Sequence, residues 1–332
     1  SNISAPIIKI AISAIAIGII MMFVAISTGF GLQDKIREKI AAFNGHIVIN
    51  NFSNNQSTIT QNSLSTTQNF YPEFTAVPEI EHIQKVATKY GIIRTETDFE
   101  GIVVKGVEEN YRWEYLQEYL VKGELPVFKN KISKEVLISD YLANRLGFDV
   151  GDKLIVYFLR DDQDRLPRSV GLTISGIFDS GFKEFDETYV IADLKQIQRL
   201  NNWEEDQIGQ FELFVEDFSE IQQVGYKVYE EVDSFLNAST IIELYPSIFE
   251  WLKMFDFNII LIIGIMILVA GINMITALLV LILERTQMIG ILKALGSTDW
   301  SIRKIFLYNA GFLIFKGLFW GNLIGLSLLF IQ

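Results

Sequence analysis

The sequence predicts a membrane protein with α-helical spans and a large α+β domain outside the membrane. Three apolar runs lie at residues 10–33, 257–283 and 305–332, and only Lys316 interrupts them with a charge. Between the first two runs, residues 31–255 contain 22 Lys+Arg and 37 Asp+Glu, so most of the acidic charge lies in one long segment. That segment also shows two-residue hydrophobic spacing, which indicates strands.

Each apolar run is long enough to cross a bilayer as a helix, because about 20 residues span a hydrocarbon core of about 30 Å. We expect spans at residues 7–33, 257–283 and 305–331. The first run is longer than the apolar stretch of a signal peptide and ends without a small-x-small cleavage site, which favours a membrane anchor. Helical spacing of apolar residues continues it as a stalk to residue 44, where Asn44-Gly45 predicts a stop.

The third run differs from the others because it contains Lys316. A charge inside the bilayer is costly unless it snorkels or faces a bundle, so we expect this span to pack against another helix. The apolar pattern continues to the last residue, and we expect a fourth span. The short loop at residues 284–304 carries four basic and two acidic residues. This excess of positive charge predicts that the loop is cytoplasmic and the acidic segment external.

The first part of the acidic segment predicts a strand, a helix and two further strands. Residues 47–49 are branched apolar residues, and the polar tract at residues 51–69 predicts a mobile loop. Apolar residues at positions 80, 83, 87 and 90 recur at helical spacing, so we expect a helix at residues 80–90. Strands are expected at residues 92–97 and 101–107.

The second part predicts a β-hairpin with flanking helices. The hairpin strands are expected at residues 153–159 and 172–178, with a polar tip at residues 160–168. The other expected elements are a strand at residues 136–138, a helix at 140–146, a strand at 211–215, and helices at 192–200 and 219–236.

No motif for an enzyme active site is present. The chain lacks a GxxxxGK[ST] phosphate loop, a GxSxG elbow and an HExxH motif, so we expect no ATPase activity of its own. With no Cys and two His it offers few metal ligands, and we expect no cofactor on this chain. The acidic clusters at residues 161–164 and 204–206 are more typical of a solvated surface than of a calcium or acid/base site. The net charge of −12 argues against binding of nucleic acid.

The loop between the last two spans contains a short amphipathic helix. Met288, Ile291, Leu292 and Leu295 fall on one helical face, and the run Gly296-Ser-Thr predicts a helix end followed by a new N-cap. Such an apolar face can dock in a groove of a partner protein. It suits the lipid surface equally well, and the residues alone leave both interpretations open.

The same stretch resembles the cytoplasmic coupling region of the FtsX/MacB/LolC-type permeases, ABC transporters that move a large external domain. The shared pattern is E-R-x-x-x-I-G-I-L-K-A-L-G between two spans. The order of one span, an external domain and the remaining spans agrees, and residues 45–49 and 269–273 are similar to the lipoprotein-releasing permeases of the LolC/LolE type. The residues that the resemblance assigns to ATPase coupling are Glu284, Arg285, Met288, Gly290, Ile291, Leu292, Lys293, Leu295 and Gly296.

The resemblance implies an inner-membrane complex with a large periplasmic domain. It implies a second permease, either the same or a paralogous chain, and ATPase subunits that bind ATP and Mg. It divides the domain into a porter-like part at residues 45–131, a β-rich subdomain at 132–218 and a return at 219–250. The implied function is ATP-driven release of lipoproteins to a periplasmic carrier. A MacB-like mechanotransmitting efflux permease and an FtsX-like, non-transporting activator of a cell-wall hydrolase are the alternatives.

Two further groups of residues receive roles from the resemblance. The hairpin tip corresponds to a loop that captures the carrier, although an ordinary hairpin tip explains it equally well. Its candidate residues are Arg165, Leu166, Pro167 and Arg168. Adaptable methionines could line a lipid cavity between the first two spans, although a plain helix interface also accounts for them. These are Met21, Met22, Met266 and Met274.

Overall fold

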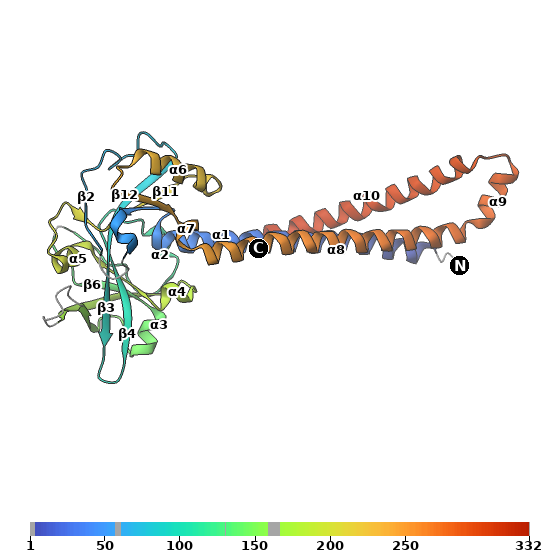
Figure 1. Ribbon diagram of the computed structural model, residues 1–332. Coiled ribbons are helices and arrows are strands. Elements are labelled where there is room, and N and C mark those ends of the chain that lie inside the picture. Colours follow the sequence, from blue (N-terminus) through green and yellow to red (C-terminus); the bar gives the residue numbers. More distant parts are fainter. Residues whose placement is uncertain (1–3, 57–60, 130, 159–166, 332) are drawn as a thin grey trace. The chain divides into compact units, whose positions relative to one another are not determined.

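The computed structural model describes residues 4–56, 61–129, 131–158 and 167–331 (Figure 1). The chain forms two compact units. The α/β unit comprises Ile36–Pro246, and the helical unit comprises the residues up to Lys35 together with those from Ser247 onward. The predicted combination of spanning helices and a large α/β domain is confirmed.

Among the residues that the structure describes, three helices are long and apolar enough to cross a membrane, as predicted. They are α1 (Ser4–Asn44), α8 (Pro246–Glu284) and α10 (Asp299–Ile331). The short helix α9 (Thr286–Ala294) lies between the last two in the sequence. The helix α1 continues beyond its apolar run to Asn44, where the sequence predicted its end. The fourth span stays a prediction.

Glycines allow α10 to pack closely against α1. Three of them repeat every fourth residue, and a Cβ atom added at any of them would lie 2.6–2.9 Å from a side chain of α1. Small residues at this spacing let two helix backbones approach each other. The third span therefore packs against another helix as expected, although the Lys316 side chain itself is exposed in this unit. The facing pairs are Gly317 with Ile15, Gly321 with Ile19, and Gly325 with Phe23.

The described residues of the α/β unit are built on a 10-stranded sheet. Most neighbouring strands are antiparallel, but β4 pairs with β9, and β6 with β8, in parallel. The strand β7 (Lys153–Phe158) lies off the main path and pairs with β3 and β8, so the predicted β7–β8 hairpin is confirmed. The order along the path is β12 (Leu236–Thr240), β1 (Ile47–Asn51), β11 (Gln210–Val215), β3 (Ile80–Arg94), β4 (Phe99–Val107), β9 (Tyr189–Asp193), β6 (Glu135–Ser139), β8 (Arg168–Phe178) and β5 (Leu120–Gly123).

Short helices complete the unit. The helix α5 (Leu194–Asn201) packs on β3, β4 and β9, and α6 (Ile221–Glu231) packs on β12. The helix α3 (Asp140–Leu146) has the predicted bounds, because Ser139 caps its start and Gly147 ends it in the left-handed conformation. The remaining short elements are η1 (Phe52–Gln56), β2 (Leu64–Ser65), α2 (Glu114–Gln117), α4 (Lys183–Asp186), β10 (Gln207–Ile208), η2 (Phe218–Glu220) and α7 (Ile241–Leu244).

The helix predicted at residues 80–90 is wrong. Those residues belong to β3, a 15-residue strand that pairs with β11 on one side and β4 on the other. Both faces of β3 carry buried residues, such as Val86 on one and Ala87 on the other. Apolar residues on both faces of a strand produce a spacing that imitates a helix. The strand also absorbs the first half, residues 92–94, of the separate strand expected at residues 92–97.

Three other expectations need correction. The proposed subdomain limits do not follow the sheet: β11 falls within residues 132–218 but pairs with β1 and β3, and β5 falls within residues 45–131 but pairs with β8. Strands from both parts of the chain are joined through long-range pairing, which sequence order does not indicate. The described part of the tract at residues 51–69 contains η1 and β2, and β2 pairs with β10. The helix expected at residues 219–236 ends at Glu231, before β12.

Candidate functional site

The helix α9 has the ends that its sequence predicts. Gly296 has φ +86°, its N–H donates to the carbonyl of Lys293, and the N–H of Ser297 donates to the carbonyl of Leu292. This pair of bonds is a Schellman motif, for which glycine is favoured at the left-handed position. The Thr298 hydroxyl then accepts from the N–H of Ser301 and caps α10. The turn between α9 and α10 is therefore fixed by local bonds.

The apolar face of α9 has little cover within the part of the chain that the structure describes. Ile291 is 57% exposed and Leu295 77% exposed, while Met288 and Leu292 are half-buried. A methyl group added at Gly290 would meet nothing within 4 Å. The face is thus available for a partner or a lipid surface. Of the polar residues that the resemblance assigns to coupling, Glu284 and Arg285 are exposed, and Lys293 forms an ion pair of 2.7 Å with Asp299.

The hairpin tip is only partly described, because Arg165 and Leu166 lie outside the described residues. Pro167 is exposed. Arg168 begins β8, and its guanidinium donates to the carbonyls of Arg199 and Leu200 at 3.1 and 3.0 Å. It therefore caps the C-terminal end of α5, a structural role that the sequence did not reveal.

The methionines lie at different positions on the spanning helices. The Met266 side chain approaches α1 at Gly18, where an added Cβ would lie 3.6 Å from its Cε. Met21 is exposed, and Met22 and Met274 are half-buried. The structure thus brings one of the four against the facing helix, and the lipid cavity stays a prediction.

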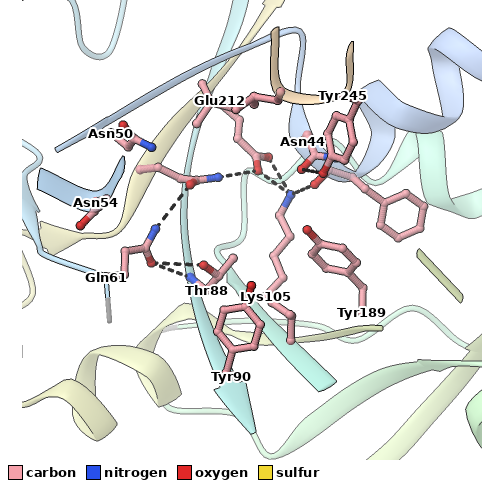
Figure 2. A pocket seen from close by; sticks show the side chains of 15 residues that line it. Asn44, Asn50, Asn54, Gln61, Thr88, Tyr90, Lys105, Tyr189, Glu212 and Tyr245 are labelled. Atoms are coloured by element: carbon pink, nitrogen blue, oxygen red, sulfur yellow. Dashed lines mark hydrogen bonds and ion pairs between the residues drawn. The ribbon is translucent and has the colours of Figure 1, made fainter. Parts of the chain in front are cut away.

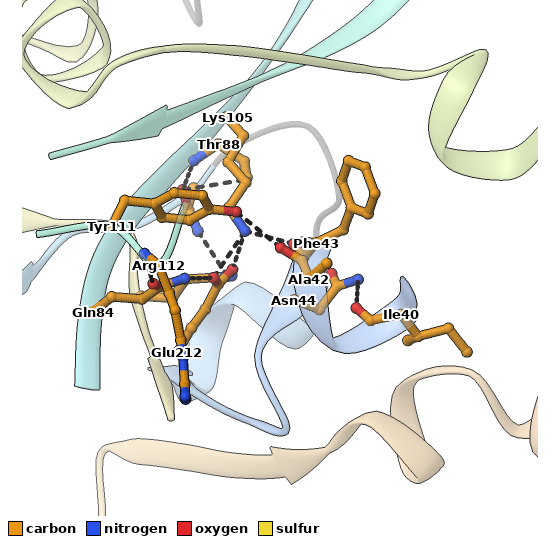
Figure 3. A network of polar contacts seen from close by, with 12 residues as sticks. Ile40, Ala42, Phe43, Asn44, Gln84, Thr88, Lys105, Tyr111, Arg112 and Glu212 are labelled. Carbon is orange, nitrogen blue, oxygen red and sulfur yellow. Dashed lines mark hydrogen bonds and ion pairs between the residues drawn. The ribbon is translucent and has the colours of Figure 1, made fainter. Parts of the chain in front are cut away.

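A second candidate site, missed at the sequence level, lies at the C-terminal end of α1 (Figure 3). The last carbonyl groups of a helix lack partners within the helix and carry partial negative charge. Here the Lys105 ammonium on β4 donates to the carbonyl of Phe43, and the Tyr111 hydroxyl donates to the carbonyl of Ala42 at 2.9 Å. The Phe43 ring stacks on Phe185 at a centroid distance of 4.6 Å. The end of α1 is thus embedded in the core of the α/β unit.

Lys105 forms an ion pair with Glu212 of β11 in the same place. The ammonium lies 2.6 and 2.8 Å from the two carboxylate oxygens, and both side chains are 1% exposed. Gln84 and Gln210 also donate to this carboxylate, at 2.8 and 3.3 Å. Burial lowers the pKa of Lys105, and the neighbouring Glu212 opposes that shift. Burial raises the pKa of Tyr111 well above its usual value, so its hydroxyl keeps the proton that it donates.

The ion pair forms the floor of a polar pocket of about 350 Å³ (Figure 2). Side-chain amides and hydroxyls line it, and they are linked to one another. Gln61 accepts from the backbone N–H of Thr88 at 2.9 Å and donates to Gln210 at 3.4 Å. Asn50 also faces this pocket, and its buried Oδ1 has no hydrogen-bond partner among the described residues.

One sequence signal could have pointed to this site. Lys105 stands in the apolar strand Ile-Val-Val-Lys-Gly-Val, where a charge needs a buried partner. The identity of that partner depends on the pairing of β3 with both β4 and β11, which no local pattern predicts.

Two models of known protein families match the chain. The family model of the MacB-like periplasmic core domain matches residues 10–227, and that of the FtsX-like permease C-terminal region matches residues 260–332. The chain belongs to the MacB/FtsX family of ABC transporter permeases. The α/β unit of this permease contains most of the residues that match the periplasmic core domain, and α9 lies within the matched FtsX-like C-terminal region.

Curated relatives match nearly the full length of the permease. It is 22% identical to the lipoprotein-releasing system transmembrane protein LolC of Haemophilus influenzae, over 94% of this chain and 75% of that protein. It is 24% identical to LolC of Neisseria meningitidis, over 96% of this chain and 76% of that protein. An uncharacterised ABC transporter permease of Methanocaldococcus jannaschii is 26% identical, over 89% of this chain and 74% of that protein.

Solved structures with similar folds are more distant. The extracellular domain of the ABC-type transporter YknZ from Gram-positive bacteria covers 59% of this chain and 100% of its own, with 10% identity and a TM-score of 0.39. The periplasmic region of MacB from Actinobacillus actinomycetemcomitans covers 61% of this chain and 92% of its own, with 12% identity and a TM-score of 0.38. The family assignment rests on the sequence matches and not on these two structures.

Proposed function

We propose that this permease releases lipoproteins from the inner membrane and passes them to a periplasmic carrier, with ATP hydrolysis on a partner subunit as the energy source. The observation that carries the proposal is the similarity to lipoprotein-releasing proteins over 94% and 96% of the chain, which includes both the domain and the spanning helices. A shared periplasmic core alone would fit other members of the family as well.

The role of α9 in this proposal is to receive the ATPase. Its exposed apolar face and its fixed turn into α10 give a partner a rigid, desolvatable surface. The partner subunit would bind ATP and Mg, since this chain lacks a phosphate loop. A second permease, identical or paralogous, would complete the membrane part.

The role of α1 is to connect the membrane to the periplasmic domain. Its C-terminal end is embedded in the domain core by Phe43 and capped by Lys105 and Tyr111. A continuous helix that is fixed at one end transmits displacement of its other end. The β7–β8 hairpin would hold the carrier in this scheme.

The proposal is tested by purification of the permease with its ATPase from a native membrane, followed by mass spectrometry of bound lipidated proteins. We expect lipoproteins to leave the complex only when ATP and a soluble periplasmic carrier are both added. Co-purification with a periplasmic adaptor and an outer-membrane channel would favour an efflux permease instead. Stimulation of a cell-wall hydrolase, without any bound substrate, would favour an FtsX-like activator.

A further inference from the structure

Two hollows of opposite polarity adjoin on one face of the sheet. The first is the polar pocket of about 350 Å³ described above. The second is an apolar groove of about 250 Å³ between β3 and β4, with Ile92 and Gly101 among its lining residues. Tyr90 and Val103 line both, so the two hollows adjoin at these residues.

The strand register explains why the two hollows share a face. In the antiparallel pair β3–β4, Tyr90 lies opposite Val103, and Ile92 lies opposite Gly101. Residues two apart on a strand, and residues directly opposite on its neighbour, point to the same side. This side therefore runs from the pocket floor at Lys105, past Tyr90, to the open groove at Gly101.

The polar end suits an uncharged group that forms hydrogen bonds. Lys105 and Glu212 neutralise each other, so the floor offers no free charge. The amides of Asn54 and Gln61 line the wall, and the Oδ1 of Asn50 is an acceptor that lacks a partner among the described residues (Figure 2). A charged head group entering here would lose water without gaining a counter-charge, which is costly. An uncharged amide, in contrast, can exchange hydrogen bonds with the side-chain amides of the wall without bringing in a charge.

The apolar end suits a hydrocarbon chain. Gly101 has no side chain opposite Ile92, and a methyl group added there would meet nothing within 4 Å. The groove therefore exists because this position is glycine. Beyond it, Tyr157 of β7 pairs with Ile92 and extends the exposed apolar surface. Burial of a chain on this surface is favourable in proportion to the apolar area covered.

We propose that this face binds an N-acylated peptide end, with the amide linkage in the polar pocket and the acyl chain along the groove over Gly101. The proposal rests on the proposed function, because lipidated proteins are then the substrates that bring such a group to the periplasmic domain. It adds to that function a resting position for the acyl chain outside the membrane.

Photocrosslinking of the full permease tests the proposal. The permease and its ATPase are reconstituted in phospholipid nanodiscs, and the probe is an N-acylated dipeptide amide with a diazirine in the acyl chain. After irradiation, mass spectrometry locates the label. We expect labelling of β3 and β4 near Tyr90 and Gly101, suppressed by excess unlabelled N-acyl peptide amide but not by a lysophospholipid with the same chain and a charged head.

Glycine variants give a matched pair for this experiment. In Gly101→Val the new side chain displaces about two methylene groups of the ligand, which reduces labelling roughly tenfold. Gly171→Val adds the same side chain to β8, at another strand glycine with nothing within 4 Å, and should leave labelling unchanged. An unchanged thermal midpoint in both variants shows that they fold.

The possible results separate this inference from the proposed function. The inference is overturned if Gly101→Val does not reduce labelling. It is also overturned if the lysophospholipid suppresses labelling as well as the N-acyl peptide amide does, and the ligand is then a membrane phospholipid. If lipoproteins still co-purify with the permease in either case, the proposed function holds without this binding site. If labelling behaves as expected but the permease purified from native membranes carries no lipoprotein, the binding site is supported and the proposed function is overturned.

Discussion

The C-terminal ends of α1 and α9 both leave carbonyl groups without partners inside the helix, and different groups satisfy them. At the end of α1, two buried side chains satisfy the helix carbonyls: Lys105 of β4 and Tyr111 of the loop after β4 are the donors. At the end of α9, the backbone of the following turn does so, and the side chains of Ile291 and Leu295 stay exposed. The first helix end is fixed within the chain. The second keeps a stable shape while its apolar face is left for contact with another molecule.

The largest expected effect on stability comes from removing the Lys105 ammonium at the end of α1. Lys105→Met leaves the Glu212 carboxylate buried without its counter-charge and should lower the free energy of unfolding by about 3–5 kcal/mol. Lys85→Met is the control, because the Lys85–Glu108 pair is partly exposed and its loss should cost about 1 kcal/mol or less. Thermal and denaturant unfolding of the full chain in detergent measure both.

A double variant sharpens this test. Lys105→Met with Glu212→Gln removes both charges and should recover part of the lost stability. Equal destabilisation by the Lys105 and Lys85 variants would mean that the buried pair does not fix the end of α1.

The next effect concerns the open face of α9. Leu292→Asp places a charge in a contact that must be desolvated, and should weaken binding of the ATPase by more than about 2 kcal/mol, or about 30-fold. Thr286→Asp introduces the same residue on the opposite side of the helix, near its N-terminus, where an acid is tolerated. Quantitative co-purification compares them. Normal ATPase binding by the Leu292 variant would instead favour a helix that rests on the lipid surface.

A third effect is the pH dependence of the segment directly after α1. Burial, and then the charge of Arg112, lower the pKa of His46 to about 4, and its Nδ1 accepts from the N–H of Val215 at 2.9 Å. The unfolded chain therefore binds a proton near pH 6.5 that the folded chain binds only near pH 4. Stability is fully present above pH 6.5 and should fall by about 2 kcal/mol between pH 7 and pH 5.

The variant His46→Asn keeps an acceptor for Val215 but cannot titrate. Its unfolding free energy should change less between pH 7 and pH 5 than that of the native chain, by the same 2 kcal/mol. Parallel pH profiles of the two proteins would show that other groups cause the dependence.

The smallest effect on stability is expected at the hairpin tip. The strands pair as far as Phe158 opposite Arg168, so residues 159–167 can be replaced by Asn-Gly in a two-residue turn. This change should abolish crosslinking to the carrier and leave the ATPase bound. Lys122→Ala is the control: it removes an exposed ion pair with Asp149 away from the tip, costs little stability because the pair is exposed, and leaves carrier crosslinking intact. Carrier capture at the normal rate by the shortened protein would place the carrier elsewhere.

The sequence predicted those parts of the fold that depend on local or long uniform patterns. The spans follow from their apolar runs, and α3 has the predicted bounds because Ser139 and Gly147 cap it. The strand β3 was predicted as a helix, since its burial on both faces is decided by neighbours that lie far away in the sequence.

The two candidate sites differ in how far apart their residues lie in the sequence. The face of α9 could be predicted because its residues are consecutive and its stop signal is local. The pair of Lys105 and Glu212 could not, because 107 residues separate its members and only the sheet brings them together.

The glycine face of α10 has a consequence for movement within the helical unit. The contacts of Gly317, Gly321 and Gly325 repeat at equal intervals along α10, and their partners on α1 repeat with the same interval. If α1 slides along α10 by one repeat, about 6 Å, Ile15 takes the position of Ile19 and again meets a glycine. The interface therefore offers a second register with the same kind of packing, and a step of one helical turn becomes a natural unit of displacement between these two helices.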